Sequence, residues 1–259
     1  MGNYKMIVQY DGTRLNGWQR QGNTGNTVQG KLEQVLGKMA GHPVEVRGAG
    51  RTDAGVHAAA QVADFALEEQ YACGYLLAYM NAWLPRDIAV QSVEPAPPEF
   101  HSRLNAKKKV YEYRIWNDPV RPVFYREYQW YIPCGRQFQD GKISELPPLD
   151  LTAMERAAAD YVGTHDFSSF CTKKQTKKSP VRTVYSVNLE QNGPEIRITF
   201  CGNGFLYNMV RIMTGTLVEI GEGRRPKDDI PRILAERSRK AAGMTAPACG
   251  LTLKEIIYL

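Results

Sequence analysis

A glycine-rich segment carries the residues best suited to chemistry. It reads GAGRTDAGVHA over residues 48–58 and directly follows a predicted strand. Glycines let a backbone approach a ligand closely and adopt positive φ angles. A carboxylate beside a guanidinium stays ionised, so Asp53 near Arg51 could act as a nucleophile or as a base. The segment therefore predicts a reactive carboxylate on a tight loop.

Three other interpretations of this segment stay open. Its start is similar to the dinucleotide-binding fingerprint, but Asp53 stands where the third glycine belongs. The spacing from Gly50 to Gly55 is similar to a P-loop, but Val56 and His57 replace the required Lys and Ser or Thr. In the third interpretation, Asp53 only hydrogen-bonds its own loop in an Asx-turn.

A second candidate is an arginine inside a long apolar segment. Residues 205–220 read FLYNMVRIMTGTLVEI, and Arg211 lies near the middle. Burying a guanidinium without a partner is costly. We therefore expect Arg211 to pair with a carboxylate, either an active-site Asp or another acid such as Glu219 or Asp64.

Basic and aromatic residues favour a nucleic acid partner. Trp18 and Arg20 lie in a polar loop, where their planar groups could stack on unpaired bases. Alternatively, Trp18 anchors the loop to its own core. Three basic runs could contact phosphates, although such runs are more often solvated surface. They are residues 107–109, residues 173–178 continued by Arg182, and residues 224–227.

The strands and helices that would position these residues are predicted in the same order in both halves of the chain. In the first half, strand patterns occupy residues 4–10, 44–47, 61–67 and 88–93, and helical patterns occupy residues 28–39 and 71–84. Thr27 is a candidate N-cap. The resulting β-α-β-β-α-β order is typical of ferredoxin-like modules.

The second half repeats this order with additions. Strands are predicted at residues 108–116, 128–132, 183–190, 195–201 and 251–258, and helices at residues 151–162, 205–220 and 227–240. Asp150 is a candidate cap, and the stiff segment EPAPP at residues 94–98 is a candidate linker. We predict an α+β fold of two ferredoxin-like modules, residues 1–98 and 99–259, with adjoining antiparallel sheets and a cleft between them.

Composition narrows the class of protein. The 259 residues carry 33 Lys and Arg against 27 Asp and Glu, and the net charge of +6 suits a polyanionic partner. The five cysteines are odd in number and form no CxxC pair, so neither a disulfide framework nor a zinc ribbon is indicated. No apolar run approaches the roughly 20 residues of a membrane span, and no signal region begins the sequence. We therefore expect a soluble, cytoplasmic protein.

These segments together resemble the tRNA pseudouridine synthase A (TruA) family along essentially the whole chain. Residues 48–58 are the most specific match, and one departure is Ser102, where a small Ala is expected. The other matching stretches are YDGT (10–13), GWQRQ (17–21), TVQG (27–30), FHSRLNAKKKVYEYRI (100–115), HDFSSF (165–170), GFLYNMVRIMTG (204–215) and TAPACGL (245–251).

The resemblance implies isomerisation of uridine to pseudouridine at positions 38, 39 and 40 of the tRNA anticodon stem-loop, by a homodimer that needs no metal or organic cofactor. It implies that Asp53 is the nucleophile and that Arg51 assists extrusion of the base. Tyr111 would lie against the uracil, Arg211 would pair with Asp53, and Leu251 would pack on the base. Gly50 and Thr52 of the same loop are expected to bind substrate.

Two other functions stay open at this stage. A non-catalytic RNA-binding protein would keep the basic runs and the aromatic residues while its glycine loop is structural. A dinucleotide-dependent enzyme is a more distant alternative.

Overall fold

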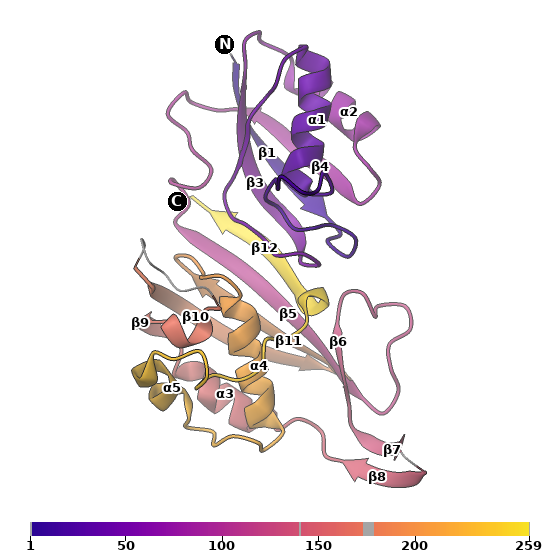
Figure 1. The fold of residues 1–259 in the computed structure, drawn as a ribbon, viewed down its shortest axis with the longest axis vertical. Coiled ribbons are helices and arrows are strands. Elements are labelled where there is room, and N and C mark those ends of the chain that lie inside the picture. The colour runs from indigo at the N-terminus through magenta and orange to yellow at the C-terminus, as the bar shows by residue number, and fades with distance from the viewer. Residues whose placement is uncertain (1, 140, 173–178, 259) are drawn as a thin grey trace. The chain divides into compact units, whose positions relative to one another are not determined.

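The structure is a computed structural model that describes residues 2–139, 141–172 and 179–258. The chain divides into two compact units, one formed by Met1–Lys109 with Thr252–Leu259 and the other by Val110–Leu251. Each unit combines β-strands with α-helices, as Figure 1 shows. The predicted α+β class is confirmed, whereas the ferredoxin-like description of the modules stays a prediction.

Unit 1 contains a sheet in the order β4-β1-β3-β12, and β2 also pairs with β3. Strand β1 is antiparallel to β3 and β4, whereas β12 is parallel to β3, with Thr252 opposite His57. The last residues of the chain, Thr252–Leu259, group with unit 1, and the predicted division into residues 1–98 and 99–259 stays a prediction. The elements are β1 (Gly2–Tyr10), α1 (Val28–Ala40), β2 (Val46–Gly48), β3 (His57–Leu67), α2 (Cys73–Trp83), β4 (Ile88–Pro95) and β12 (Leu251–Ile257).

Helix α1 forms for the reasons that the sequence indicates. The Thr27 side chain accepts a hydrogen bond from the Gly30 N–H, which confirms it as the N-cap. Val28, Leu32 and Leu36 recur at helical spacing and are fully buried. Figure 1 shows α1 and α2 together on one side of the unit 1 sheet, so this apolar face of α1 helps to form the core.

Unit 2 contains a sheet in the order β5-β11-β10-β9, to which β6 adds in parallel beside β5. Helices α3 and α4 pack against each other beside this sheet (Figure 1). Asp150 caps α3 by accepting from the Ala153 N–H, as predicted. The elements are β5 (Lys108–Asp118), β6 (Trp130–Pro133), β7 (Gly135–Gln139), β8 (Lys142–Leu146), α3 (Leu151–Ala159), β9 (Gly163–Asp166), β10 (Val181–Asn192), β11 (Glu195–Gly202), α4 (Met209–Gly221) and α5 (Ile230–Glu236).

Unit 2 also differs from the predicted elements. The antiparallel pair β7-β8 and the short strand β9 were not predicted. Helix α4 begins four residues after Phe205, because Asn208 adopts a left-handed backbone with φ of 62°. Helix α5 is shorter than residues 227–240, because Arg237 turns the backbone left-handed at φ of 49°. Across the described part of the chain, no helix is both long and apolar enough to cross a membrane.

Candidate active site

The predicted reactive loop connects β2 to β3 and is fixed by bonds to other segments. The Ala49 N–H donates to Val62 O (2.8 Å), and the Gln61 amide donates to Gly50 O (3.0 Å). The Lys109 ammonium donates to Ala49 O (2.5 Å). The first half of the loop is therefore held from β3 and from the start of β5.

Trp18 packs directly against the loop. It is only 1% exposed, so the prediction that it stacks on RNA bases is wrong and the alternative, an anchor in the core, is correct. Its backbone N–H donates to Thr52 O (3.1 Å). A side chain at Gly48 would collide with the Trp18 ring, and a Cβ at Gly17 would lie 2.6 Å from Thr52 O. Glycine is required at both positions, because the backbone at Gly17 packs against the Thr52 carbonyl and the backbone at Gly48 packs against the Trp18 ring.

Asp53 lies at the turn of this loop. Its carbonyl accepts from the Val56 N–H (3.1 Å), which closes a four-residue turn, and Gly55 follows with φ of 78°. The Asp53 side chain is half-buried, whereas Arg51 is exposed. The loop thus presents the carboxylate from a turn whose shape is set by backbone hydrogen bonds.

Thr52 connects the loop to strand β1. Its hydroxyl lies 2.8 Å from the Tyr10 hydroxyl, and both side chains are buried. Burial raises the pKa of Tyr10 above its usual range, more than its hydrogen bonds to Thr52 and Gln61 lower it. The phenol therefore stays neutral and acts as a structural support for the residue that precedes Asp53.

In unit 2, the predicted substrate residue Tyr111 lies on β5. It is 7% exposed, and its ring meets the Phe205 ring edge-on, with centroids 5.3 Å apart and planes at 87°. Edge-to-face pairs of this kind restrict the orientation of both rings. Phe205 was not predicted as a site residue, although it lies in the matching stretch 204–215.

Arg211 lies in the first turn of α4. Its Nε donates to Ala246 O (2.8 Å), and its Nη1 donates to Asn208 Oδ1 (3.2 Å). The Ala246 N–H donates back to Arg211 O (3.1 Å). The segment that leads to Leu251 is therefore bound to α4 next to the guanidinium.

Leu251 is 5% exposed at the end of that segment. The Tyr113 hydroxyl donates to Pro247 O (2.7 Å). Burial raises the pKa of Tyr113 well above its usual value, so its hydroxyl remains a donor. At Gly250, a Cβ would lie 2.6 Å from the Tyr113 ring, which fixes the path of the chain into Leu251.

The two other carboxylates considered for Arg211 have different partners. Asp64 accepts from Arg47 Nε (2.8 Å) and from the Ser102 N–H (2.8 Å). The buried Ser102 hydroxyl donates to Arg47 O (2.7 Å), a bond that the Ala expected at this position could not make. Glu219 accepts from Arg225 Nε (2.5 Å) and from a backbone N–H.

The structure thus groups the predicted site residues in two sets. Gly50, Arg51, Thr52 and Asp53 share one loop of unit 1, and the others belong to unit 2: Tyr111, Arg211 and Leu251. Within the described ranges, no group of three or more His, Cys, Asp or Glu side chains could hold a metal ion.

The three basic runs differ in how far their side chains are exposed to solvent and able to contact phosphates. Lys107 and Lys108 are exposed, whereas residues 173–178 lie outside the described part of the chain. Arg225 is half-buried, and its guanidinium binds both Glu219 and Asp229. It is therefore a poor phosphate contact, contrary to what its run suggested.

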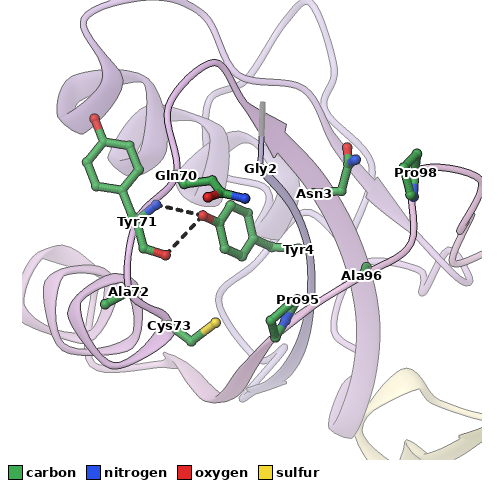
Figure 2. Close-up of a pocket in the computed structure, with 10 residues that line it drawn as sticks. All are labelled: Gly2, Asn3, Tyr4, Gln70, Tyr71, Ala72, Cys73, Pro95, Ala96 and Pro98. Carbon is green, nitrogen blue, oxygen red and sulfur yellow. Dashed lines mark hydrogen bonds between the residues drawn. The ribbon is translucent and has the colours of Figure 1, made fainter.

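A cavity of about 630 Å³ lies elsewhere in unit 1 (Figure 2). The Tyr4 hydroxyl in it donates to Tyr71 O (3.0 Å) and accepts from the Tyr71 N–H (2.7 Å). Residues of the Asp53 loop do not line this cavity, and its tyrosine is engaged with backbone. We therefore do not place the chemistry there.

Comparison with known proteins identifies the family. The family model described as tRNA pseudouridine synthase matches residues 6–105 and 157–259. The chain belongs to this family. It is 44% identical to tRNA pseudouridine synthase A of Bacillus sp. (strain KSM-64) over 258 residues, covering all of both chains. It is 41% identical to tRNA pseudouridine synthase A 2 of Bacillus cereus and 40% identical to the synthase A of Acetivibrio thermocellus, again over full length. Pseudouridine synthases are isomerases, so the chain is an enzyme of that class.

Proposed function

We propose that this protein isomerises uridine to pseudouridine at positions 38, 39 and 40 of the tRNA anticodon stem-loop, with Asp53 as the nucleophile. The observation that carries the proposal is the placement of Asp53 on a loop that other segments hold in shape. The backbone carbonyls of Gly50, Thr52 and Asp53 all accept hydrogen bonds. These hydrogen bonds fix the path of the backbone on both sides of the Asp53 side chain.

The reaction begins with a base that is not accessible in a stacked stem. Flipping the nucleotide out costs a few kcal/mol of unstacking. Arg51 is exposed beside Asp53, and we assign to it the extrusion of the base. Tyr111 would offer a ring face to the uracil, and its orientation is supported by Phe205. Leu251 would pack on the base.

The chemistry conserves all atoms. The Asp53 carboxylate attacks either C1′ of the ribose or C6 of the uracil, and the N1–C1′ bond breaks. The base turns, a C5–C1′ bond forms, the bond between the Asp53 oxygen and the substrate carbon breaks, C5 loses its proton and N1 gains one. No electron is transferred, so the balance requires no oxidant or reductant. A positive charge from Arg211 would keep the Asp53 carboxylate ionised. Exclusion of water prevents hydrolysis of the intermediate.

The test is the variant Asp53→Asn, which keeps the shape of the side chain. We expect pseudouridine formation on tRNA to fall by at least about a thousandfold while tRNA binding survives. The exposed Asp228 of unit 2 provides a matched control, because Asp228→Asn removes the same charge elsewhere. Near-normal turnover by Asp53→Asn would refute the assignment. A pure protein that binds tRNA but forms no pseudouridine would favour the non-catalytic alternative.

We further propose that the enzyme acts as a homodimer in the cytoplasm, where its tRNA substrate is. The hairpin β7-β8 supports this, because Phe138 is 76% and Ile143 is 73% exposed. These side chains form a cross-strand pair, and so do Arg136 and Glu145 on the same face. An isolated hairpin is marginally stable in water. A two-fold axis would cover the apolar pair and place each Arg136 against the partner's Glu145.

The mass of the protein in solution tests the homodimer. We expect a dimer for the natural sequence and a monomer for Phe138→Ser with Ile143→Ser. Tyr75→Ser, which removes an exposed aromatic ring from α2, should leave the dimer intact. A fully active monomer of the natural sequence would contradict this part of the proposal.

A further inference from the structure

The connection between β11 and α4 contacts both of the predicted site residues that lie on β5 and α4. Phe205 packs edge-on against Tyr111, and three residues later Asn208 binds Arg211. Phe205 supports the orientation of Tyr111 in the reaction proposed above, whereas Asn208 has no assigned role in it. Of the two, Asn208 has the more unusual backbone.

Asn208 occupies the position before the first residue of α4 but does not act as an ordinary N-cap. An N-cap asparagine has an extended backbone, and its side chain accepts from an N–H of the first turn. Asn208 has φ of 62° and ψ of 7°, and its side chain makes no capping hydrogen bond. Among the described non-glycine residues, Arg237 is the only other one with positive φ. Asparagine tolerates this conformation better than most residues do.

The left-handed backbone directs the carboxamide to other partners. Its Oδ1 accepts from Arg211 Nη1 (3.2 Å), and its Nδ2 donates to Thr172 Oγ1 (3.0 Å). Because Arg211 Nε also donates to Ala246 O (2.8 Å), two nitrogens of the guanidinium are held at once. A guanidinium is planar, so two fixed nitrogens define the orientation of the whole group.

We propose that Asn208 is a positioning residue for the reaction and acts through Arg211. Its left-handed conformation gives up the usual helix cap and uses the carboxamide to fix the guanidinium plane. This inference rests on the proposed function, since it assumes that Arg211 takes part in the site. Catalysis then depends on the amide acceptor of Asn208 and not only on the fold of the α4 terminus.

Three variants separate the backbone from the carboxamide. Asn208→Gly keeps the left-handed conformation and removes the acceptor. Asn208→Asp keeps both the conformation and an oxygen that can accept from Arg211. Thr172→Val is the matched control, because it removes the other partner of the carboxamide and leaves the contact with Arg211. The single-turnover rate and the Kd for tRNA are measured for each variant, together with the melting temperature.

We expect Asn208→Gly to lower the single-turnover rate by about tenfold to a hundredfold, as misplacement of a catalytic group does. Its Kd and melting temperature should stay near those of the unchanged protein, and Asn208→Asp should restore most of the rate. Thr172→Val should lie within about twofold of the unchanged rate. Equal losses in Asn208→Gly and Asn208→Asp, or an unchanged rate in Asn208→Gly, would overturn the proposal.

A second measurement reports the contact without activity. The Nη1–H resonance of Arg211, identified by its loss in Arg211→Lys, should shift and exchange faster with water in Asn208→Gly but not in Asn208→Asp, because Nη1 is the nitrogen that donates to Asn208. An unchanged resonance in Asn208→Gly would overturn the proposed contact. If the unchanged protein forms no pseudouridine, the proposed function fails and the role in catalysis fails with it, while this resonance still tests whether Asn208 holds the guanidinium.

Discussion

Replacing Thr52 by Val tests whether the Asp53 loop depends on its connection to β1. The two side chains are nearly equal in shape, so the change removes one hydroxyl and little volume. Thr52 is 6% and Tyr10 is 4% exposed, and their oxygens lie 2.8 Å apart. A lost buried hydrogen bond of this kind costs about 1–2 kcal/mol, because the remaining hydroxyl cannot reach water. Tyr10 keeps a hydrogen bond to Gln61, which favours the lower half of that range.

A double-mutant cycle makes this prediction specific. We expect Thr52→Val and Tyr10→Phe each to lower the free energy of unfolding by about 1 kcal/mol or somewhat more, and the double variant to lose less than the sum by about 1 kcal/mol. Urea unfolding followed by circular dichroism measures these differences. For a segment the length of unit 1, a loss of 1 kcal/mol corresponds to a melting temperature lower by about 4 °C.

The functional part of the cycle uses the rate of pseudouridine formation. Because Thr52 directly precedes Asp53, a loosened loop should reduce the rate in both single variants even where the protein is fully folded. Strictly additive stability losses would show that the two hydroxyls do not interact. An unchanged rate in Thr52→Val would show that this connection does not position the carboxylate.

Three further outcomes follow from the structure. Substituting Gly48 by Ala should destabilise the protein by about 1–3 kcal/mol, because the new methyl group meets the buried Trp18 ring; unchanged urea unfolding would contradict this. Tyr111→Phe should retain much of the activity, whereas Tyr111→Ala should lose far more, and equal rates would remove the ring from the substrate site. For Asp229, the hydrogen bond from a neighbouring arginine lowers the pKa despite burial. Its stabilising contribution is therefore present above the ordinary pKa of an aspartate and lost as pH falls through the lower folded value, and Asp229→Asn should flatten the stability profile below about pH 4.

The elements that carry regular apolar spacing were predictable. Helix α1 follows from Val28, Leu32 and Leu36, and its cap follows from Thr27. The hairpin β7-β8 was missed because its strands contain few apolar residues, although Asp140-Gly141 is a common turn pair. Strand β9, Gly163–Asp166, offers four residues without a strand pattern.

The burial and the partners of single side chains could not be predicted in the same way. An Asp among glycines indicated the loop, but the sequence could not show that Trp18 lies beneath it, because burial of one aromatic residue depends on contacts distant in the chain. Arg225 looked like surface charge within a basic run, whereas Glu219 and Asp229 bind it inside unit 2. Asn208 interrupts an apolar run that predicts helix from Phe205 onward, and only the backbone reveals the left-handed turn.

The close packing of Gly17 and Gly48 has a consequence for substrate recognition. Glycine at these two positions allows close packing against Thr52 and the Trp18 ring, and it does not serve to make the loop mobile. The ordering entropy of the loop is therefore lost when the protein folds, and in the proposed reaction Asp53 would already be in position before RNA arrives. Most of the rearrangement during recognition should then fall on the nucleic acid.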